Sequence, residues 1–145
     1  MTSTTKAVVP AASATKRVAT PGFEVSFVPA DFRVGHMRRI TTVYLRCHGM
    51  ADVIDSALLA VSELVTNAIQ HGGGRPVGLR VVPSAGALCI EVTDSSPIPA
   101  RTRTAATDDE NGRGLQLVSA ISKEWGVSVD GMTTWCSLAT TERGN

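Results

Sequence analysis

The chain has 145 residues, of which 43% are hydrophobic and 19% are charged, with 14 Lys and Arg residues against 13 Asp and Glu residues. The length is that of a single domain, and the composition is that of an ordinary globular protein. A chain so nearly neutral argues against a general nucleic-acid-binding or membrane-surface role.

The cysteines give no sign of a metal or redox site. There are 3 of them, they stand far apart, and none belongs to a Cys-x-x-Cys or Cys/His spacing. We therefore expect a reduced, cytoplasmic setting, in which Cys89 and Cys136 pack as small hydrophobic side chains.

Two tails are expected to flank the domain. Residues 1–21 are rich in Thr, Ser and Ala and precede the first acidic residue, Glu24, which predicts disorder rather than a signal peptide. No apolar run approaches the roughly 18 residues of a membrane-spanning helix. We expect one domain over residues 22–140 and a short C-terminal tail over residues 141–145.

A strand and a helix are the first predicted elements. Phe23–Val28 alternates apolar and polar residues, as a half-buried strand does. Asp31 is the expected N-cap of the helix, which would end before Gly49 and carry one apolar stripe. The stripe consists of Phe32, Val34, Met37, Ile40, Val43 and Tyr44.

A second helix is predicted from Asp52, its expected cap, to the glycines that follow His71. Its apolar residues fall within an arc of about 120°, the width of a face that packs on a sheet. We expect that face to be buried. The arc consists of Ile54, Ala57, Leu58, Val61, Leu64, Val65 and Ala68.

The next predicted elements are a hairpin and a long loop. Pro76–Val82 and Ala87–Thr93 have strand character, and the turn between them contains Gly86. Residues 94–112 are polar and rich in Ser, Thr, Pro and Arg, and this segment is longer than the usual connection of about 4 to 6 residues. Loops of that length are commonly functional lids or disordered segments.

A third helix and a second hairpin complete the predicted domain. Apolar residues at helical spacing predict a helix over Gly114–Trp125, followed by strands at Val127–Val129 and Met132–Ala139 around a turn at Gly131. The order strand, helix, helix, two strands, loop, helix, two strands predicts an α+β domain. Its helices would cover one face of a mostly antiparallel sheet.

Glu63 and Asn67 are the first candidates for chemistry. One turn apart on the second helix, they share a face that points away from the apolar arc, toward solvent or a cleft. A solvated helix face would explain the pair without any function. In a nucleotide site, Asn67 would offer Mg²⁺ a hard oxygen ligand, and Glu63 could accept a proton beside the terminal phosphate. His71 would either touch the site or cap the helix end.

Asp94 and a pair of glycines are the second set of candidates. At the end of a strand, Asp94 could accept a hydrogen bond from the amine of adenine or simply initiate a turn. Gly112 and Gly114, on either side of Arg113, would let backbone N–H groups approach a phosphate at a helix N-terminus. Their spacing matches neither a P-loop nor a Rossmann motif.

In their order along the chain, these segments resemble the sequence boxes of the histidine-kinase-like ATPases, the GHKL superfamily with the Bergerat fold. The resemblance covers about residues 23–139. It implies a two-layer α/β sandwich of the α+β class, with a mostly antiparallel mixed sheet and helices on one face. Ser62–Gly72 resembles the N box, Asp94–Pro97 the adenine-binding box, Gly112–Leu115 the glycine box and Thr133–Trp135 the threonine element of the last strand.

Within that superfamily, the short chain most resembles the serine-kinase anti-sigma factors. The resemblance implies ATP and Mg²⁺ as cofactors, and an anti-anti-sigma antagonist and a sigma factor as partners; relatives of this type often form homodimers. It also implies a role for each candidate residue. Glu63 would be the catalytic base, Asn67 the Mg²⁺ ligand and Asp94 the adenine ligand; Gly112 and Gly114 would line the phosphates, Arg113 would contact phosphate or a partner, and Thr134 would lie near adenine.

One departure from the family lies in the adenine-binding box. The family pattern is Asp-x-Gly-x-Gly, whereas Ser96 and Ile98 occupy the two glycine positions here. Side chains where the backbone should approach the base can weaken nucleotide binding, and Pro97 and Pro99 stiffen the segment. Two hypotheses follow: a protein serine/threonine kinase, and a catalytically weak or inactive module that acts by sequestering a regulator.

Overall fold

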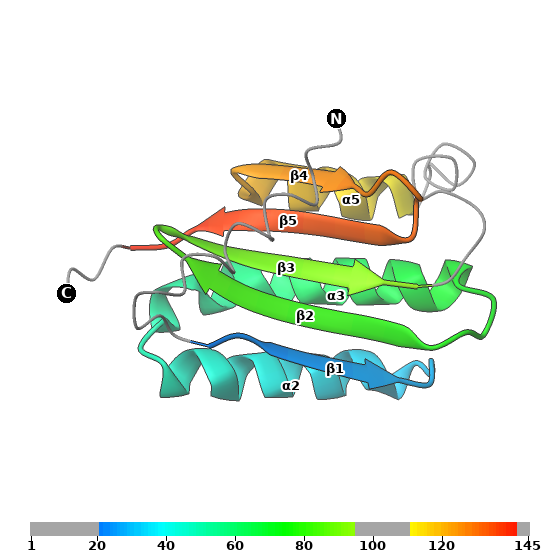
Figure 1. The fold of residues 1–145 in the computed structure, drawn as a ribbon, viewed down its shortest axis with the longest axis horizontal. Helices are drawn as coiled ribbons and strands as arrows, with labels where there is room; N and C mark the ends of the chain where they lie inside the picture. Colours follow the sequence, from blue (N-terminus) through cyan, green and yellow to red (C-terminus); the bar gives the residue numbers. More distant parts are fainter. Residues whose placement is uncertain (1–20, 95–110, 142–145) are drawn as a thin grey trace.

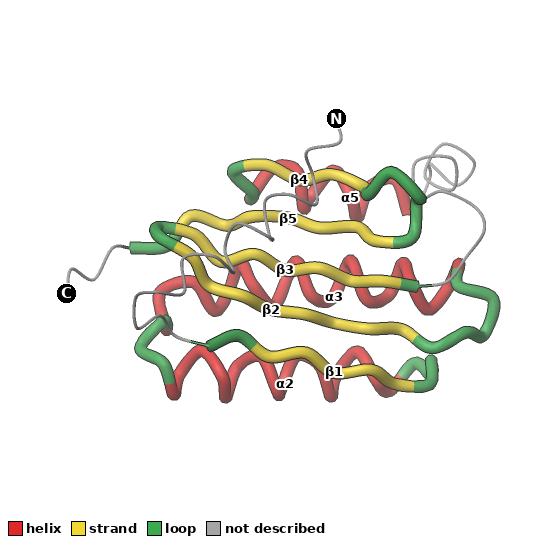
Figure 2. Tube along the Cα trace, in the orientation of Figure 1, coloured by secondary structure: helices red, strands yellow, loops and turns green. Residues whose placement is uncertain are grey.

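The structure is a computed structural model that describes residues 21–94 and 111–141. In these residues the chain forms a five-stranded sheet with helices on one face, as Figures 1 and 2 show. This two-layer α+β arrangement confirms the predicted fold class. The predicted tails at residues 1–21 and 141–145 and the predicted loop at residues 94–112 lie almost entirely outside the described residues.

The sheet consists of β1 (Phe23–Phe27), β2 (Val77–Ser84), β3 (Ala87–Thr93), β4 (Glu124–Val127) and β5 (Thr133–Ala139). The strand order is β1-β2-β3-β5-β4, and every pairing in the described sheet is antiparallel. β1 and β4 are therefore the edges of the sheet, and β3 is its central strand (Figure 1). Along each strand, side chains that face the helices alternate with side chains on the open face.

The helices of the described residues are α2 (Phe32–Cys47), α3 (Ile54–His71) and α5 (Asn111–Ile121), with a 3-10 turn, η2 (Ala51–Val53), ahead of α3. α3 lies behind the middle of the sheet, between α2 and α5 (Figure 1). Most of its predicted apolar arc is buried, and each fully buried Leu or Val contributes about 1.5 to 3 kcal/mol relative to exposure. The buried apolar residues of α3 are Ala57, Ala60, Val61, Leu64, Val65 and Ala68.

Glycines follow the end of α3 and turn the β2–β3 hairpin, as predicted. Gly73 and Gly74 have φ angles of 67° and 82°, left-handed values that glycine adopts without steric cost. Gly86 has a φ of 69° in the short turn between Ser84 and Ala87, which pair with each other. β2 runs as far as Ser84, beyond the predicted end of the strand.

Neither predicted aspartate caps a helix with its side chain. Asp31 stands at the N-cap of α2, but its φ of −54° and ψ of −37° are already helical, and its side chain makes no capping hydrogen bond. A capping side chain usually needs a backbone that is still extended. Asp52 lies inside η2, and α3 begins at Ile54 after Val53. The N-cap position predicted for Asp31 is therefore confirmed, although its side chain forms no capping hydrogen bond, and the cap predicted at Asp52 is wrong.

The third helix ends earlier than predicted. α5 ends at Ile121, and Trp125 belongs to the edge strand β4, where it pairs with Cys136 of β5. Apolar spacing in this segment fits a helix, but pairing with a strand elsewhere in the chain decides its conformation. The strand predicted at Val127–Val129 is present but lies earlier in the chain, because β4 spans Glu124–Val127 and shares only Val127 with the predicted range.

Helix α2 exposes much of its predicted apolar stripe. Phe32, Ile40 and Val43 are 60%, 39% and 56% exposed. These three residues are exposed because α2 packs on α3 at one side of the fold, so that the described elements cover only part of its surface (Figure 1). The fully buried residues of α2 are Met37, Thr41 and Leu45.

The cysteines are free thiols that differ in exposure: Cys47 is exposed, Cys89 is partly buried and Cys136 is buried. Burial raises the pKa of Cys136 to about 11 and that of Cys89 to about 12. In residues 21–94 and 111–141, no group of three or more His, Cys, Asp or Glu side chains is placed to hold a metal ion. No helix in the same residues has the length and apolar character needed to cross a bilayer.

Candidate functional site

Glu63 lies against the first turn of α5. A Cβ atom placed on Gly114 would collide with Oε1 of Glu63 and would stand 3.4 Å from its carboxyl carbon. The carboxylate, which comes from the middle of α3, therefore occupies the space that a side chain at Gly114 would need. The structure thus brings together one residue of the predicted N box and one of the predicted glycine box.

Asn67 follows Glu63 by one helical turn and is buried, with 8% of its surface exposed. Its side-chain oxygen Oδ1 has no hydrogen-bond partner among the described residues. Buried acceptors of this kind are rare, because the lost hydration costs about 1 to 3 kcal/mol. A hard cation would restore the missing interaction, and oxygen ligands suit Mg²⁺. The chemistry of this atom therefore fits the ligand role that the sequence predicts.

Asp94 follows the end of β3 and lies beside the C-terminal end of α3. It is 4% exposed, and its backbone N–H donates a hydrogen bond to the carbonyl of Met132 at 2.9 Å. A Cβ atom placed on Gly72 would stand 3.4 Å from the Cβ of Asp94 and only 2.6 Å from the carbonyl oxygen of Ala68. Gly72 therefore permits the close approach between the end of α3 and the end of β3.

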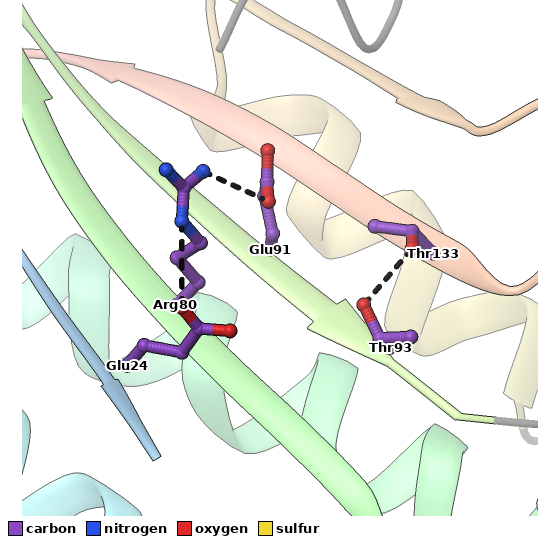
Figure 3. A network of polar contacts seen from close by, with 5 residues as sticks. All are labelled: Glu24, Arg80, Glu91, Thr93 and Thr133. Carbon is purple, nitrogen blue, oxygen red and sulfur yellow. Dashed lines mark hydrogen bonds and ion pairs between the residues drawn. The ribbon is translucent and has the colours of Figure 1, made fainter. Parts of the chain in front are cut away.

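Thr134 brings β5 into the same region. It lies opposite Val92 in the β3–β5 register, is 6% exposed, and belongs to the face of the strand that points toward the helices. Its neighbour Thr133 pairs with Thr93 on the open face, where their hydroxyl oxygens lie 2.9 Å apart (Figure 3). Thr134 therefore lies close to the strand end that carries Asp94.

The first turn of α5 contributes backbone N–H groups. α5 begins at Asn111, so Gly112, Arg113 and Gly114 all belong to its first turn. The first four N–H groups of a helix have no partner within the helix, and they form a binding site for anions such as phosphate. Ser96 and Ile98 of the predicted adenine-binding box lie outside the described residues.

Arg38 makes a contact with α3 that sequence reasoning missed. From α2, its guanidinium donates hydrogen bonds to Oγ of Ser62 at 2.6 Å and to the carbonyl of Leu58 at 3.3 Å. It thus holds a positive charge beside the residue that precedes Glu63. No spacing rule links residues on two different helices, so only the packing of α2 on α3 reveals this contact.

A separate polar cluster lies on the open face of the sheet (Figure 3). Arg80 of β2 forms ion pairs with Glu91 of β3 at 3.4 Å and with Glu24 of β1 at 3.9 Å. Burial raises the pKa of Glu91, although the charge of Arg80 acts against that rise. Because these side chains point away from the helices, they do not belong to the candidate site.

The candidate residues follow one side of α3. From Glu63, beside the start of α5, to Gly72, beside Asp94, the helix rises about 14 Å at 1.5 Å per residue. One end of this stretch offers backbone N–H groups to an anion, and the other offers a buried carboxylate to a hydrogen-bond donor. Such an arrangement suits a ligand with an anionic end and an amine-bearing end.

A family model described as the histidine kinase-like ATPase domain matches residues 27–138. The chain belongs to this family. Membership of the histidine kinase-like ATPase family implies that the domain binds ATP, and the matched range includes Glu63, Asn67, Asp94, Gly114 and Thr134. An uncharacterized protein of Streptomyces coelicolor is 41% identical over 76 residues, which are 49% of this chain and 71% of that protein.

Proposed function

We propose that this histidine kinase-like ATPase domain is an anti-sigma-factor-like protein serine/threonine kinase. It transfers the γ-phosphate of ATP to a serine or threonine of an anti-anti-sigma protein. It also binds a sigma factor and thereby regulates transcription. The observation that carries the proposal is the pair on α3, where the buried Asn67 oxygen without a partner lies one turn from the Glu63 carboxylate.

Each candidate residue has a distinct role in the proposed complex with ATP. Asn67 would hold Mg²⁺, which neutralises charge on the phosphates when it is bound. The N–H groups at the start of α5 would receive phosphate oxygens, and Arg113 would contact a phosphate or the partner. Asp94 would accept a hydrogen bond from the adenine amine, with Thr134 beside the base.

Glu63 is the base of the proposed transfer step. The hydroxyl oxygen of the acceptor side chain attacks the γ-phosphorus, and the bond from that phosphorus to the bridging oxygen breaks. ADP leaves with the bonding electron pair, and the hydroxyl proton passes to the Glu63 carboxylate. The rate of such a step depends on how the base is positioned, so the contact between Glu63 and Gly114 bears directly on the rate.

A second candidate function is sequestration of a regulator without efficient phosphate transfer. Ser96 and Ile98, which stand in place of the two glycines of the adenine-binding box, favour this alternative. On this alternative, nucleotide serves as a structural ligand or is not needed, and capture of the protein partner is the function. The two candidates differ in one measurable respect, which is the appearance of phosphate on a partner protein.

Transfer of radioactive phosphate from γ-labelled ATP to proteins in a lysate of the source cells tests the kinase proposal. With Mg²⁺, the wild-type chain is expected to label a partner on serine or threonine, and Asp94→Asn is expected to abolish the label because adenine recognition fails. Asp52→Asn makes the same chemical change at an exposed residue of η2 and is expected to label normally. A lysate that gains no label from the wild-type chain would exclude the kinase and leave sequestration.

A further inference from the structure

An apolar groove with a volume of about 740 Å³ lies between the edge strand β1 and helix α2. It lies on the far side of α3 from α5, so it is distinct from the candidate ATP site (Figure 1). Its walls are apolar side chains of both elements, among them Phe23 and Val25 of β1 and Ile40 and Val43 of α2.

The groove is open because the described elements cover only part of the surface of α2. The helix packs on α3 through residues such as Thr41 and Leu45, which are both fully buried. Another side faces β1, which pairs only with β2 in the described sheet. Ile40 and Val43 on that side are 39% and 56% exposed, and Phe32 and Val28, which adjoin the lining residues Arg33 and Phe27 in the chain, are 60% and 66% exposed. Exposed apolar side chains gathered around a hollow indicate an interaction surface.

Positive charge surrounds these apolar walls. The charged residues that line the groove are Arg33 and Arg39, and none of the described residues that line it is acidic. The whole of α2 contains Arg and His residues but no Asp or Glu. Arg39 is exposed and forms no ion pair with another described residue. A partner that complements this surface therefore carries negative charge next to apolar side chains.

The shape of the groove suits a helix. It follows α2 from Arg33 to Tyr44, which is about 16 Å at 1.5 Å per residue, or about three helical turns. Tyr44 closes one end, because its ring lies against Phe23 with centroids 5.0 Å apart and its hydroxyl donates to the carbonyl of Pro21 at 2.7 Å. A groove of this length along a helix can receive the apolar face of a second helix.

We infer that this groove binds an amphipathic helix of a partner protein, about three turns long, whose apolar face is flanked by Asp and Glu residues. A second copy of this chain is a poor occupant. In a two-fold contact through this face, both copies would present Arg33 and Arg39 and no acidic residue among the described residues that line the groove, so like charges would meet without a counter-charge. Binding here needs no phosphate transfer, so it does not depend on the proposed kinase activity.

The probe for this groove is a fluorescein-labelled synthetic helix with Leu on one face and Glu on both flanks of that face. A control peptide carries Lys in place of every Glu and is otherwise identical. Fluorescence anisotropy with the full chain is expected to show saturable binding of the acidic peptide that weakens as salt is added, because part of the attraction is electrostatic. The basic peptide is expected not to bind.

Substitutions inside and outside the groove locate the binding. Arg39→Glu reverses a charge on the rim and Ile40→Asp places a charge on the apolar wall, and each is expected to raise the Kd of the acidic peptide at least about tenfold. Arg46→Glu makes the same charge reversal on the same helix at an exposed residue outside the groove, and it is expected to have a much smaller effect. All three residues are exposed, so the fold and the affinity for Mg²⁺-ATP are expected to survive, which circular dichroism and calorimetry check.

Several outcomes would overturn this inference. The wild-type chain would fail to bind the acidic peptide, or it would bind the basic peptide equally well. An effect of Arg46→Glu as large as that of Arg39→Glu would show attraction to net charge rather than a groove. Sedimentation that shows a wild-type dimer turned into monomer by Ile40→Asp would assign the groove to a second copy of the chain. None of these outcomes bears on the kinase proposal, which fails separately when the chain transfers no phosphate.

Discussion

Replacing Glu63 with Gln is expected to reduce phosphate transfer at least about a hundredfold, because a positioned general base contributes about 10² to 10⁴ in rate and an amide cannot accept the proton. Binding of Mg²⁺-ATP is expected to stay nearly unchanged, since the substitution keeps the shape of the side chain. Glu63 forms no ion pair with another described residue, so the fold does not depend on its charge. Transfer is measured with radiolabelled ATP and affinity by calorimetry.

The matched control for this substitution is Glu124→Gln, the same change at an exposed residue of the edge strand β4, away from α3. It is expected to leave both transfer and affinity unaltered. Equal rates of transfer by the wild type and by Glu63→Gln would remove Glu63 from the role of base.

Gly114→Ala tests the position of the Glu63 carboxylate through a change on α5. The added Cβ would overlap Oε1 of Glu63, and because that atom ends a flexible side chain, the carboxylate is expected to move while the backbone stays in place. Alanine also favours the helix by about 1 kcal/mol over glycine. Transfer is therefore expected to fall without any loss of melting temperature. Phosphate transfer by this variant at the wild-type rate would show that the position of the Glu63 carboxylate is unimportant.

Asn67→Leu is expected to change stability and ligand binding in opposite directions. Leu has nearly the shape of Asn and removes the buried oxygen that has no partner, so the free energy of unfolding without nucleotide is expected to rise by about 1 to 3 kcal/mol. The variant is expected to lose the Mg²⁺-dependent part of its affinity for ATP, because Leu offers Mg²⁺ no oxygen ligand. Urea unfolding and calorimetry with and without Mg²⁺ measure the two effects.

Thr41→Val is the matched control for Asn67→Leu. Thr41 of α2 is fully buried, and its Oγ1 also has no hydrogen-bond partner among the described residues. Its replacement is expected to raise stability in the same way and to leave ATP binding unchanged, because it lies on a different helix from the site. A loss of stability in Asn67→Leu, together with unchanged Mg²⁺ dependence, would assign the Asn67 side chain a purely structural role.

The periodicity of apolar residues predicted the elements of which a whole face is buried. It did not settle the burial of α2 or the bounds of the edge strand β4, which lie at the two sides of the fold. The apolar arc of α3 and the β2–β3 hairpin follow from spacing and from glycine alone. The exposure of the α2 stripe does not, because residues such as Ile40 and Val43 have the spacing of a buried stripe but line the groove that the described elements leave open. Trp125 has helical spacing, and only pairing with Cys136 on β5 shows that it lies in a strand.

The candidate site, too, was only partly predictable from the sequence. The pair Glu63 and Asn67 could be predicted, because a spacing of one turn on one helix fixes a shared face. The burial of Asn67, which turns a solvated face into part of a site, depends on the rest of the fold. The approach of Asp94 to Gly72 likewise depends on tertiary packing. No sequence pattern predicts the contact of Arg38 with Ser62, because the packing of α2 on α3 decides which residues meet.

Calorimetric titration of the full chain with ATP in the presence of Mg²⁺, followed by the same titration with GTP, tests the ATP site most directly. One ATP is expected to bind per chain, and GTP is expected to bind far more weakly, because the Asp94 carboxylate accepts a hydrogen bond from the adenine amine and repels the guanine carbonyl. Asp94→Asn is expected to weaken ATP binding. No heat of binding at millimolar ATP, or equal affinities for ATP and GTP, would contradict a site formed by α3, β3, β5 and α5.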